Sequence, residues 1–392
     1  MKHREEILVS GGGLAGLIAA VAFGNSGYEV LCIDPTDENK FKRVDLRTTA
    51  YLQPSQLFLQ KIGVWPLVEH SSAPLKIMRI ADIAGEKLTV KDFNSSDISD
   101  APFGWNVRNL DMREGLLARI KALPNVVYET GLSTASTTSR STMARVTLSN
   151  SRIIDCKLLI AADGRDSSIR EQAGVAMKRT EFGQSALSFS VTHELPHNNI
   201  STEVHKVGGP FTLVPLPDFE GKPSSAVVWM DKTENINNIK ALPPAAFNAA
   251  ITQRSGAVLG KLTAVTNCAK WPIISQLADH FFAERTAFIA ETAHVVPPIG
   301  AQGLNLSIGD IETLLKLAKS SSDDIGSLTL LKKYHKIRRP IAQSRVIGVG
   351  LLNRASKADG PIAARARALG LNAIHNIKPL RHALMQLGIG LR

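Results

Sequence analysis

Apolar residues near the N-terminus follow first the period of a strand, then that of a helix, and then that of a second strand. Ile7–Val9 form a short apolar run, and Val30–Ile33 form another that stops at Asp34. Between the two runs, apolar positions recur at the i, i+3, i+4, i+7 spacing of one helix face: Leu14, Leu17, Ile18 and Val21. The pattern therefore predicts a βαβ unit over Ile7–Asp34.

Beyond residue 34 the pattern predicts a mixed α/β fold. Helices are expected over residues 55–62, 111–123, 243–262 and 304–317, and strands over 75–90, 144–161 and 287–290. The Ser- and Thr-rich residues 133–142 are expected to form a loop, whereas residues 186–229 alternate in the manner of a mainly antiparallel second sheet. Residues 327–391 are expected to be helical, with breaks at Pro340, Gly360-Pro361, Gly370 and Pro379.

The glycines between the first strand and the helix have the spacing of a dinucleotide-binding turn. Gly11 permits the tight turn, Gly13 lets the backbone approach a pyrophosphate, and Gly16 lets the helix pack on the strand. Unpaired N–H groups at the helix start would meet phosphate charge, and Asp34 stands where an acid can hydrogen-bond a ribose diol. A glycine turn alone can be purely structural, but strand, helix, second strand and terminal acid together predict a bound adenine dinucleotide.

Length and composition indicate a soluble globular protein with two domains or one large composite domain. The chain has 392 residues, of which 44% are hydrophobic and 21% charged. No uninterrupted apolar run reaches the ~18–20 residues of a membrane span, and Glu5-Glu6 do not fit a signal peptide, so we expect a cytoplasmic protein. Three cysteines without a Cys-x-x-Cys pair, and His193 and His197 separated by Pro196, predict neither a disulfide nor a metal site.

Positive charge is concentrated at the C-terminal end of the chain. The formal net charge is +11, yet residues 331–392 alone contain thirteen Lys and Arg against one acid, Asp359. Such a tail suggests contact with an anionic surface: a membrane, an acidic partner protein or a nucleic acid. A solvated helical face accounts for the same composition equally well.

Two further segments have the composition of ligand-binding loops. Asp163-Gly164 follows the apolar strand Leu158–Ala161, and an acid at the carboxyl end of a strand suits a ligand that crosses the sheet. In Phe288–Asp310 a short strand ends at Glu291, a Pro297-Pro298 turn follows, and a glycine-bearing loop opens a helix whose N–H groups can face a developing anion.

The order of these motifs resembles a known family. GxGxxG, then Asp-Gly-x-x-Ser-x-x-Arg from Asp163, then Ala-His-x-x-Pro-Pro-x-Gly-x-Gln-Gly-x-Asn from Ala293, is similar to the class A FAD-dependent aromatic monooxygenases, and within them to the ubiquinone-biosynthesis hydroxylases. Residues 209–216, 334–340, 351–354 and 369–371 also match stretches of that subfamily, so the resemblance covers nearly the whole chain.

The resemblance implies a glutathione-reductase-like FAD domain of Rossmann type, an inserted, mainly antiparallel substrate sheet and a helical C-terminal segment. The implied boundaries are 1–73, 100–175 and 284–326 for the FAD domain, 74–99 and 176–283 for the substrate sheet, and 327–392 for the helices. Residues implied to contact FAD are Gly11, Gly13, Leu14, Ala15, Gly16, Asp34, Arg47, Asn109, Asp163, Glu291, Pro298, Gly300, Gly303, Leu304 and Asn305. Phe211, Leu213 and Trp229 are expected to line the substrate pocket.

The chain departs from the family pattern in two places, at Ala290-Glu291 and at Ser307. Relatives carry Gly-Asp where this chain has Ala290-Glu291, so the acid is one methylene longer and the residue before it gains a Cβ. Ser307 stands in place of a usual glycine. His294 is a weak candidate for a general base, and an orienting or structural role beside the prolines is the preferred interpretation.

The function that the resemblance implies is ring hydroxylation of a polyprenylated phenol in ubiquinone biosynthesis. FAD would be the cofactor, NAD(P)H the co-substrate that reduces it, and O₂ the oxygen source through a flavin C4a-hydroperoxide. The alternatives are a hydroxylase of a small soluble aromatic acid and a non-catalytic scaffold subunit of a biosynthetic complex. We expect peripheral contact with an anionic membrane at its inner face or with other ubiquinone-biosynthesis proteins, no nucleic-acid partner and no metal, and homo-oligomerisation is left open.

Overall fold

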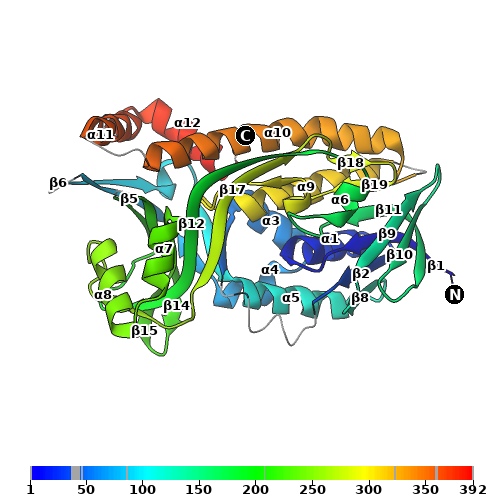
Figure 1. Cartoon of the computed structure of the whole chain (residues 1–392), viewed down its shortest axis with the longest axis horizontal. Coiled ribbons are helices and arrows are strands. Elements are labelled where there is room, and N and C mark those ends of the chain that lie inside the picture. The colour runs from blue at the N-terminus through cyan, green and yellow to red at the C-terminus, as the bar shows by residue number, and fades with distance from the viewer. Residues whose placement is uncertain are drawn as a thin grey trace.

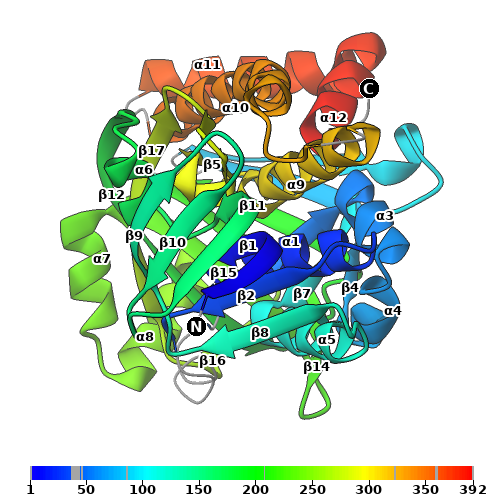
Figure 2. The same cartoon turned by 90° about the vertical axis from the view of Figure 1, so that its right-hand side faces the viewer.

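The computed structural model describes residues 2–36, 45, 47–84, 87–206, 208–321, 324–357 and 361–390 (Figure 1). Two large sheets stand side by side, and a row of helices from the end of the chain lies along one edge of both (Figures 1 and 2). Residues 85 and 86, within the strands predicted over 75–90, and the predicted break at Gly360 lie outside the described residues.

The first sheet contains the predicted βαβ unit. Its path is β18-β19-β11-β1-β2-β8, in which every pair is parallel except β18 with β19. The strands are β1 (Lys2–Ser10), β2 (Val30–Asp34), β8 (Val126–Thr130), β9 (Thr134–Ser139), β10 (Ala144–Leu148), β11 (Ile153–Ala161), β18 (Phe282–Ala283) and β19 (Thr286–Phe288). All five residues of β2 are buried, as expected of a parallel strand covered on both faces.

Helix α1 (Leu14–Gly24) packs on this sheet beside α5 (Asn109–Lys121) and α9 (Gln302–Ser320). Its residues from Gly16 to Gly24 are all buried, so the helix is apolar around most of its circumference. A small antiparallel sheet of β3 (Thr48–Leu52), β7 (Gly104–Arg108) and β4 (Ala73–Leu75) lies next to it. Short helices complete this part of the chain: α3 (Gln53–Lys61), α4 (Trp65–Val68), α6 (Ser168–Gln172), η1 (Glu69–Ser71), η2 (Ser95–Asp97) and η3 (Ala290–Thr292).

The second large sheet is antiparallel except where β13 pairs with β5. Its path is β20-β17-β12-β15-β14-β13-β5-β6, with β16 added to β12. The strands are β5 (Ile77–Ala84), β6 (Lys87–Asn94), β12 (Met177–His193), β13 (Ile200–Lys206), β14 (Gly209–Phe219), β15 (Lys222–Lys232), β16 (Leu262–Ala264), β17 (Ala269–Ala278) and β20 (His294–Val295). Helices α7 (Thr233–Lys240) and α8 (Pro244–Arg254) cover one of its faces through a shared apolar cluster.

Three helices form the C-terminal part: α10 (Leu328–Lys357), α11 (Pro361–Asn376) and α12 (Lys378–Ile389). Within the described residues no helix is both long and apolar enough to cross a bilayer. The predicted helical tail is present, but the breaks predicted at Pro340 and Gly370 are wrong, because α10 and α11 run through them. In α10, packing of Tyr334, Arg338 and Ala342 outweighs the local cost of the proline.

Two other expectations are wrong. Residues 133–142 are not a loop, since Thr134–Ser139 form β9, the outer strand of a hairpin with β10. The helix predicted over residues 243–262 ends at Arg254, and α7 and β17 were not predicted. The residue boundaries given above for the domains stay a prediction.

Candidate cofactor site

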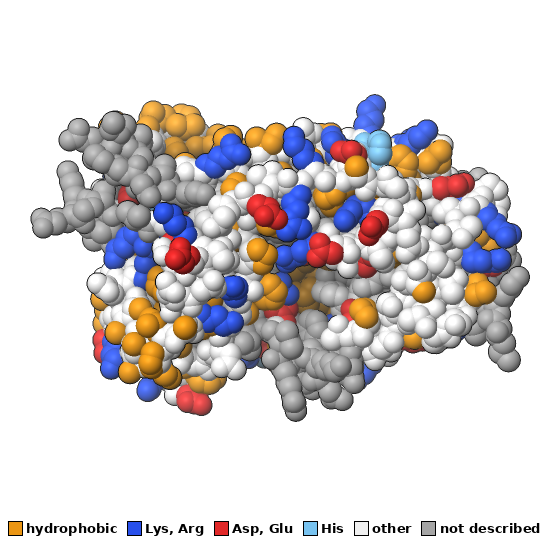
Figure 3. Space-filling view, viewed as in Figure 1, with side chains coloured by type: hydrophobic (Ala, Val, Ile, Leu, Met, Phe, Trp, Pro, Cys, Tyr) orange, Lys and Arg blue, Asp and Glu red, His pale blue; other side chains and the backbone are white. Residues whose placement is uncertain are grey.

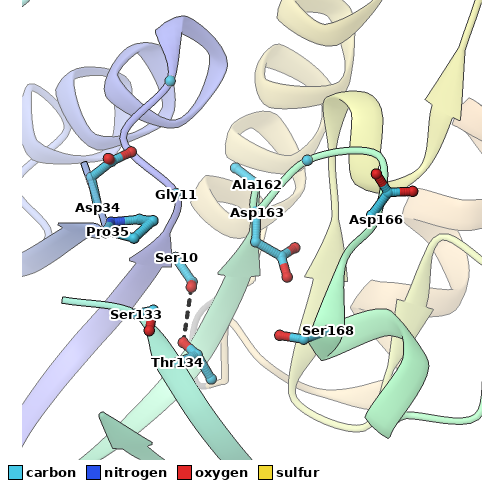
Figure 4. A pocket seen from close by; sticks show the side chains of 12 residues that line it. Ser10, Gly11, Asp34, Pro35, Ser133, Thr134, Ala162, Asp163, Asp166 and Ser168 are labelled. Carbon is cyan, nitrogen blue, oxygen red and sulfur yellow. Dashed lines mark hydrogen bonds between the residues drawn. The ribbon is translucent and has the colours of Figure 1, made fainter. Parts of the chain in front are cut away.

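A cavity of about 380 Å³ opens at the carboxyl ends of β1, β2 and β11 (Figure 4). In Figure 4 the Asp34 and Asp163 side chains project from the ends of two different strands toward this space. The cavity is lined by Ser10, Gly11, Gly13, Asp34, Pro35, Ser133, Thr134, Ala162, Asp163, Gly164, Asp166 and Ser168. The structure thus brings together the glycine turn, the acid of β2 and the Asp-Gly motif, three segments that are far apart in sequence.

Gly11 and Gly16 are required by close backbone contacts, whereas Gly13 faces open space. Gly11 has φ +111°, and a Cβ there would overlap the carbonyl oxygen of Ala162. A Cβ on Gly16 would overlap the carbonyl oxygen of Gly11, so this glycine sets the approach of α1 to β1. Gly13 has an ordinary φ of −66°, and a Cβ there would meet nothing within 4 Å. The space in front of Gly13 is therefore open to a ligand.

Asp34 is buried and supports the turn from the end of β2. Its Oδ2 accepts a 2.6 Å hydrogen bond from the Gly12 N–H, and its Oδ1 accepts one of 2.7 Å from the Thr36 N–H. Arg113, a buried residue of α5, donates to the Gly12 carbonyl (2.6 Å) and to the Tyr128 hydroxyl (2.7 Å). Sequence reasoning missed Arg113, because nothing in the pattern of its helix indicates that an arginine reaches the glycine turn.

Thr134 was also missed, since it was assigned to a loop. Its hydroxyl lies 2.8 Å from the Ser10 hydroxyl across the cavity wall (Figure 4). Both side chains are buried and belong to strands of the same sheet. Recognition of β9 as a strand would have placed Thr134 beside the cofactor cavity.

Asp163 is connected to the segment that follows β19. The Thr292 hydroxyl donates to Asp163 Oδ1 (3.0 Å) and lies 3.2 Å from the Gly164 N–H, while Asp163 Oδ2 accepts from the Ile169 N–H (3.2 Å). Arg170 donates to the Thr292 carbonyl (3.0 Å), so both ends of Thr292 are held. A buried threonine thus joins the Asp-Gly motif to the segment that follows β19.

Arg47 and Asn109 form a second group around Asp45. The Arg47 guanidinium makes two hydrogen bonds to the Asp45 carboxylate (2.7 and 2.8 Å), and Asn109 Nδ2 makes a third (3.1 Å). Although burial would raise it, the pKa of Asp45 lies below its ordinary value because of these partners. The Arg47 Cζ atom lies 4.7 Å from the ring centre of Trp271, which ties this group to β17 of the second sheet.

The loop before α9 presents glycines toward open space. Pro298, Gly300 and Gly303 are exposed, and a Cβ on Gly303 would meet nothing within 4 Å. Leu304 lies in the first turn of α9, where N–H groups have no partner inside the helix. Asn305 serves structure instead: it accepts from the Leu52 N–H (2.9 Å) and donates to the carbonyls of Ala50 and Ala301 (2.8 and 2.6 Å).

Glu291 is half-exposed and 3.4 Å from the guanidinium of Arg165. This ion pair joins η3 to the segment after Asp163. Ala290, immediately before it, has φ +55°, a left-handed conformation that favours the glycine found in relatives. Ser307, the other departure, hydrogen-bonds the Gly303 carbonyl of its own helix (3.1 Å) and leaves the loop unobstructed.

His294 is buried within an ion-pair network. Its Nε2 lies 2.5 Å from Asp310 Oδ2, and Arg338 Nε donates to Asp310 Oδ1 (2.8 Å). Burial alone would raise the pKa of Asp310, but the interactions with His294 and Arg338 hold it below its ordinary value. With its side chain 1% exposed, His294 is placed to hold β20, α9 and α10 together, which favours the structural interpretation.

The structure does not bring Phe211, Leu213 and Trp229 to this site. All three are buried in the apolar cluster beneath α7 and α8, with the Phe211 and Trp229 ring centres 5.5 Å apart. Side chains alternate across a sheet, so the residues on either side of Trp229 face the other way. Val228 and Met230 belong to a separate apolar cluster with Ile299 of the loop before α9, and this is the face that borders the candidate site.

The donors and spaces described here fit an adenine dinucleotide. Gly13 offers a close backbone approach, α1 offers a helix N-terminus, and Asp34 offers a carboxylate at the far end of the same cavity. A second helix N-terminus, at α9, faces the exposed side of the Pro298–Gly303 loop. Hydrogen bonds of Thr292 to Asp163 and of Asn305 to the Ala50 carbonyl connect the segments around the start of α9 to the Asp-Gly motif and to β3.

Comparison with known proteins gives the same assignment. The FAD binding domain family matches residues 4–347. The ubiquinone hydroxylase UbiL of Rhodospirillum rubrum is 30% identical over 397 residues, which cover 98% of this chain and 89% of that one. The 3-demethoxyubiquinol 3-hydroxylase of Escherichia coli is 24% identical, with 98% of both chains covered.

Solved structures share the fold at low sequence identity. The p-nitrophenol 4-monooxygenase PnpA from Pseudomonas putida superposes with a TM-score of 0.79 at 17% identity and covers all of both chains. PqsL from Pseudomonas aeruginosa, a probable FAD-dependent monooxygenase, gives a TM-score of 0.79 at 19% identity, with 94% and 99% of the two chains covered. The predicted fold class is confirmed. The chain therefore belongs to the FAD binding domain family, among the FAD-dependent aromatic monooxygenases that include the ubiquinone hydroxylases.

Proposed function

We propose that this protein hydroxylates the aromatic ring of a polyprenylated phenol in ubiquinone biosynthesis, with FAD as cofactor and NAD(P)H and O₂ as co-substrates. The reaction would convert the ring C–H, O₂ and NAD(P)H with one proton into the phenol, water and NAD(P)⁺. The observation that supports it most is the cavity in which the glycine turn, Asp34 and Asp163 meet. Relatives at 24–30% identity over nearly the whole chain are named ubiquinone hydroxylase or 3-demethoxyubiquinol 3-hydroxylase.

In this proposal the residues of the first sheet hold the cofactor. Gly11 and Gly13, with the N-terminus of α1 at Leu14 and Ala15, would receive the pyrophosphate, and Asp34 the adenosine ribose. Asp163 would contact the middle of the cofactor from the opposite wall. FAD, when bound, supplies the redox and oxygen chemistry, so the chain itself needs only to bind, orient and exclude water.

A second group of residues would act near the ring system of the cofactor. The N-terminus of α9, with Gly300, Gly303 and Leu304, can stabilise a negative charge that develops in front of it. Arg47 adds a fixed positive charge: burial would lower its pKa, but Asp45 and the charge of Glu291 raise it, so the guanidinium stays protonated. Asn109 and Asp45 set the direction of this side chain.

The substrate would lie between the Pro298–Gly303 loop and the second sheet. Where the loop meets this sheet, Ile299 packs with an apolar cluster of Phe182, Ala186, Val228, Met230 and Ile273. Such apolar surroundings would suit a phenol with a hydrocarbon chain better than the carboxylate of a small aromatic acid, which calls for a cationic partner. Because a polyprenyl chain partitions into a bilayer, we also propose peripheral contact with an anionic membrane.

The visible spectrum of the purified protein is the first test, because FAD absorbs there and the protein does not. We expect stoichiometric FAD, and NAD(P)H oxidation coupled to one hydroxylated phenol per O₂ consumed. A protein without flavin that cannot be reconstituted would be a scaffold subunit. Bound flavin with faster turnover of a small aromatic acid than of a short-chain prenyl phenol would establish the soluble-acid alternative.

A further inference from the structure

Large apolar side chains are exposed along the outer edge of the C-terminal helices. Figure 3 shows hydrophobic side chains gathered with Lys and Arg along the upper edge of the molecule, over these helices. Figures 1 and 2 show that α10, α11 and α12 lie along this edge. The residues of this tail apolar surface are Ile347, Leu351 and Leu352 of α10, Leu369 of α11, and Ile377, Leu380, Leu384 and Leu387 at α12.

Helix α12 has two apolar faces, of which one is covered. Met385 and Ile389 face inward, into a cluster with Leu52, Phe93 and Phe103. Leu380, Leu384 and Leu387 have the i, i+4, i+7 spacing of one face, and they are 39%, 39% and 60% exposed. A surface helix normally turns polar residues outward, so the outer leucines of α12 are without the covering that the inner face has.

The charge of the C-terminal helices is almost entirely positive. The sequence of α12 contains no acidic residue, and the tail from residue 331 has thirteen Lys and Arg against one acid. Lys332, Lys333 and Lys336 are exposed in the first half of α10, and Lys378 and Arg354 are exposed next to the apolar positions. Arg381 is not among the available cations, because it pairs with Asp97 at 3.2 Å.

The C-terminal end of α12 contacts the first residue of α9. Gln302 donates to the carbonyl of Gly388 (3.0 Å), and Arg345 of α10 donates to the carbonyl of Leu387 (2.7 Å). Leu52, in the inner cluster, donates its N–H to Asn305 of α9 (2.9 Å). A partner bound to the outer face of α12 would therefore be separated from the N-terminus of α9 only by α12 itself.

We propose that the tail apolar surface lies in the plane of an anionic lipid bilayer, with α12 as its main contact. Outward leucines flanked by Lys and Arg, without acids, form the pattern of a helix that binds at the lipid interface. Contact with a second copy through this surface would bring two tails of charge +12 together, which like-charge repulsion disfavours. Delivery of a polyprenylated substrate from the bilayer to the site rests on the proposed function, whereas the membrane contact itself does not.

The experiment is co-sedimentation of the full chain with vesicles. The probes are phosphatidylcholine vesicles with and without about one-third phosphatidylglycerol. We expect binding to the anionic vesicles only, with a bound fraction that falls as salt is raised. The triple variant Leu380→Gln, Leu384→Gln, Leu387→Gln should bind at least tenfold more weakly than the parent. The matched control Val127→Gln, Leu195→Gln, Leu242→Gln changes three residues of 52%, 53% and 38% exposure elsewhere and should bind like the parent.

Other outcomes would overturn the proposal. Equal binding of the α12 variant and the parent would show that α12 is not the contact. A parent that binds no vesicles, and whose mass by analytical ultracentrifugation falls by half in the α12 variant, would show that the surface joins two copies. Flavin content and turnover of a water-soluble phenol are measured in the same preparations. A parent protein that contains no flavin and turns over no phenol would refute the proposed function. The vesicle experiment decides the membrane contact separately.

Discussion

Gly13 is the one glycine of the turn whose role concerns only the ligand. Its φ of −66° suits any residue, and the space beyond it is open. Gly13→Val should therefore fold normally but exclude the pyrophosphate, giving a colourless protein with the circular dichroism and melting temperature of the unliganded parent. Gly11→Ala is the contrast, since its Cβ would overlap Ala162 and should prevent folding. Full flavin occupancy in Gly13→Val would refute the assignment of this cavity.

Ala290 is held in a conformation that costs energy for a residue with a Cβ. Its φ is +55°, whereas Ala293 in the same segment has φ −99° and is fully buried. Ala290→Gly should raise the free energy of unfolding by about 0.5–1 kcal/mol, because glycine adopts the left-handed region without strain. Ala293→Gly is the matched control and should lower it. Urea unfolding measures both, and a destabilised Ala290→Gly would show that the methyl group contributes packing.

Single-residue predictions from sequence depended on whether the position had a local cause. Gly11, Gly13 and Asp34 could be placed because strand and helix periods fix where the turn must be. Trp229 could not, because a shift of one residue along a strand moves a side chain to the other face of the sheet. Thr292 could not either, since its partner Asp163 is more than a hundred positions away in sequence.

At the scale of elements, three segments meet at Asp310: β20 through His294, α9, to which Asp310 itself belongs, and α10 through Arg338. Asp310→Asn would leave Arg338 with one uncompensated buried charge, so we expect a loss of about 3–5 kcal/mol in the free energy of unfolding. As a control, Asp92→Asn breaks the half-exposed pair with Arg79 and should cost about 1 kcal/mol or less. Similar losses in the two variants would show that the buried network contributes no more to the free energy of unfolding than a partly exposed ion pair does.

Elements with a clear period were predicted well, and those shaped by tertiary contacts were not. The helices at α3, α5 and α9 and the strands of the βαβ unit have apolar spacing that can be recognised locally. β9 is composed of Ser and Thr and is a strand because β10 lies beside it. α10 continues through Pro340 because the residues around the proline pack against the rest of the chain.

At the scale of the whole molecule, the sequence indicated the parts but not their arrangement. The concentration of positive charge in the tail is visible in the sequence. That α12 lies against the start of α9 depends on contacts such as Gln302 with Gly388, for which no local pattern exists. The same holds for Arg47, whose stacking on Trp271 joins the residue before β3 to β17 of the second large sheet.

The stability of the whole chain should fall in two steps as the pH is lowered. Burial and the neighbours His280 and Arg339 hold the pKa of His335 below its ordinary value, and burial does the same for His193 with His197 nearby. The unfolded chain, with histidine pKa near ~6.5, then binds more protons than the folded one, so stability is full above about pH 6.5 and declines below it. The second step belongs to groups such as Asp310, whose lowered pKa gives stability that is lost below about pH 4.

His335→Asn keeps an acceptor for the Phe281 N–H and should flatten the first step, whereas the exposed His70→Asn should not. The check is the free energy of unfolding in urea between pH 7.5 and 5. An unchanged slope in His335→Asn would place the first step at His193 or elsewhere.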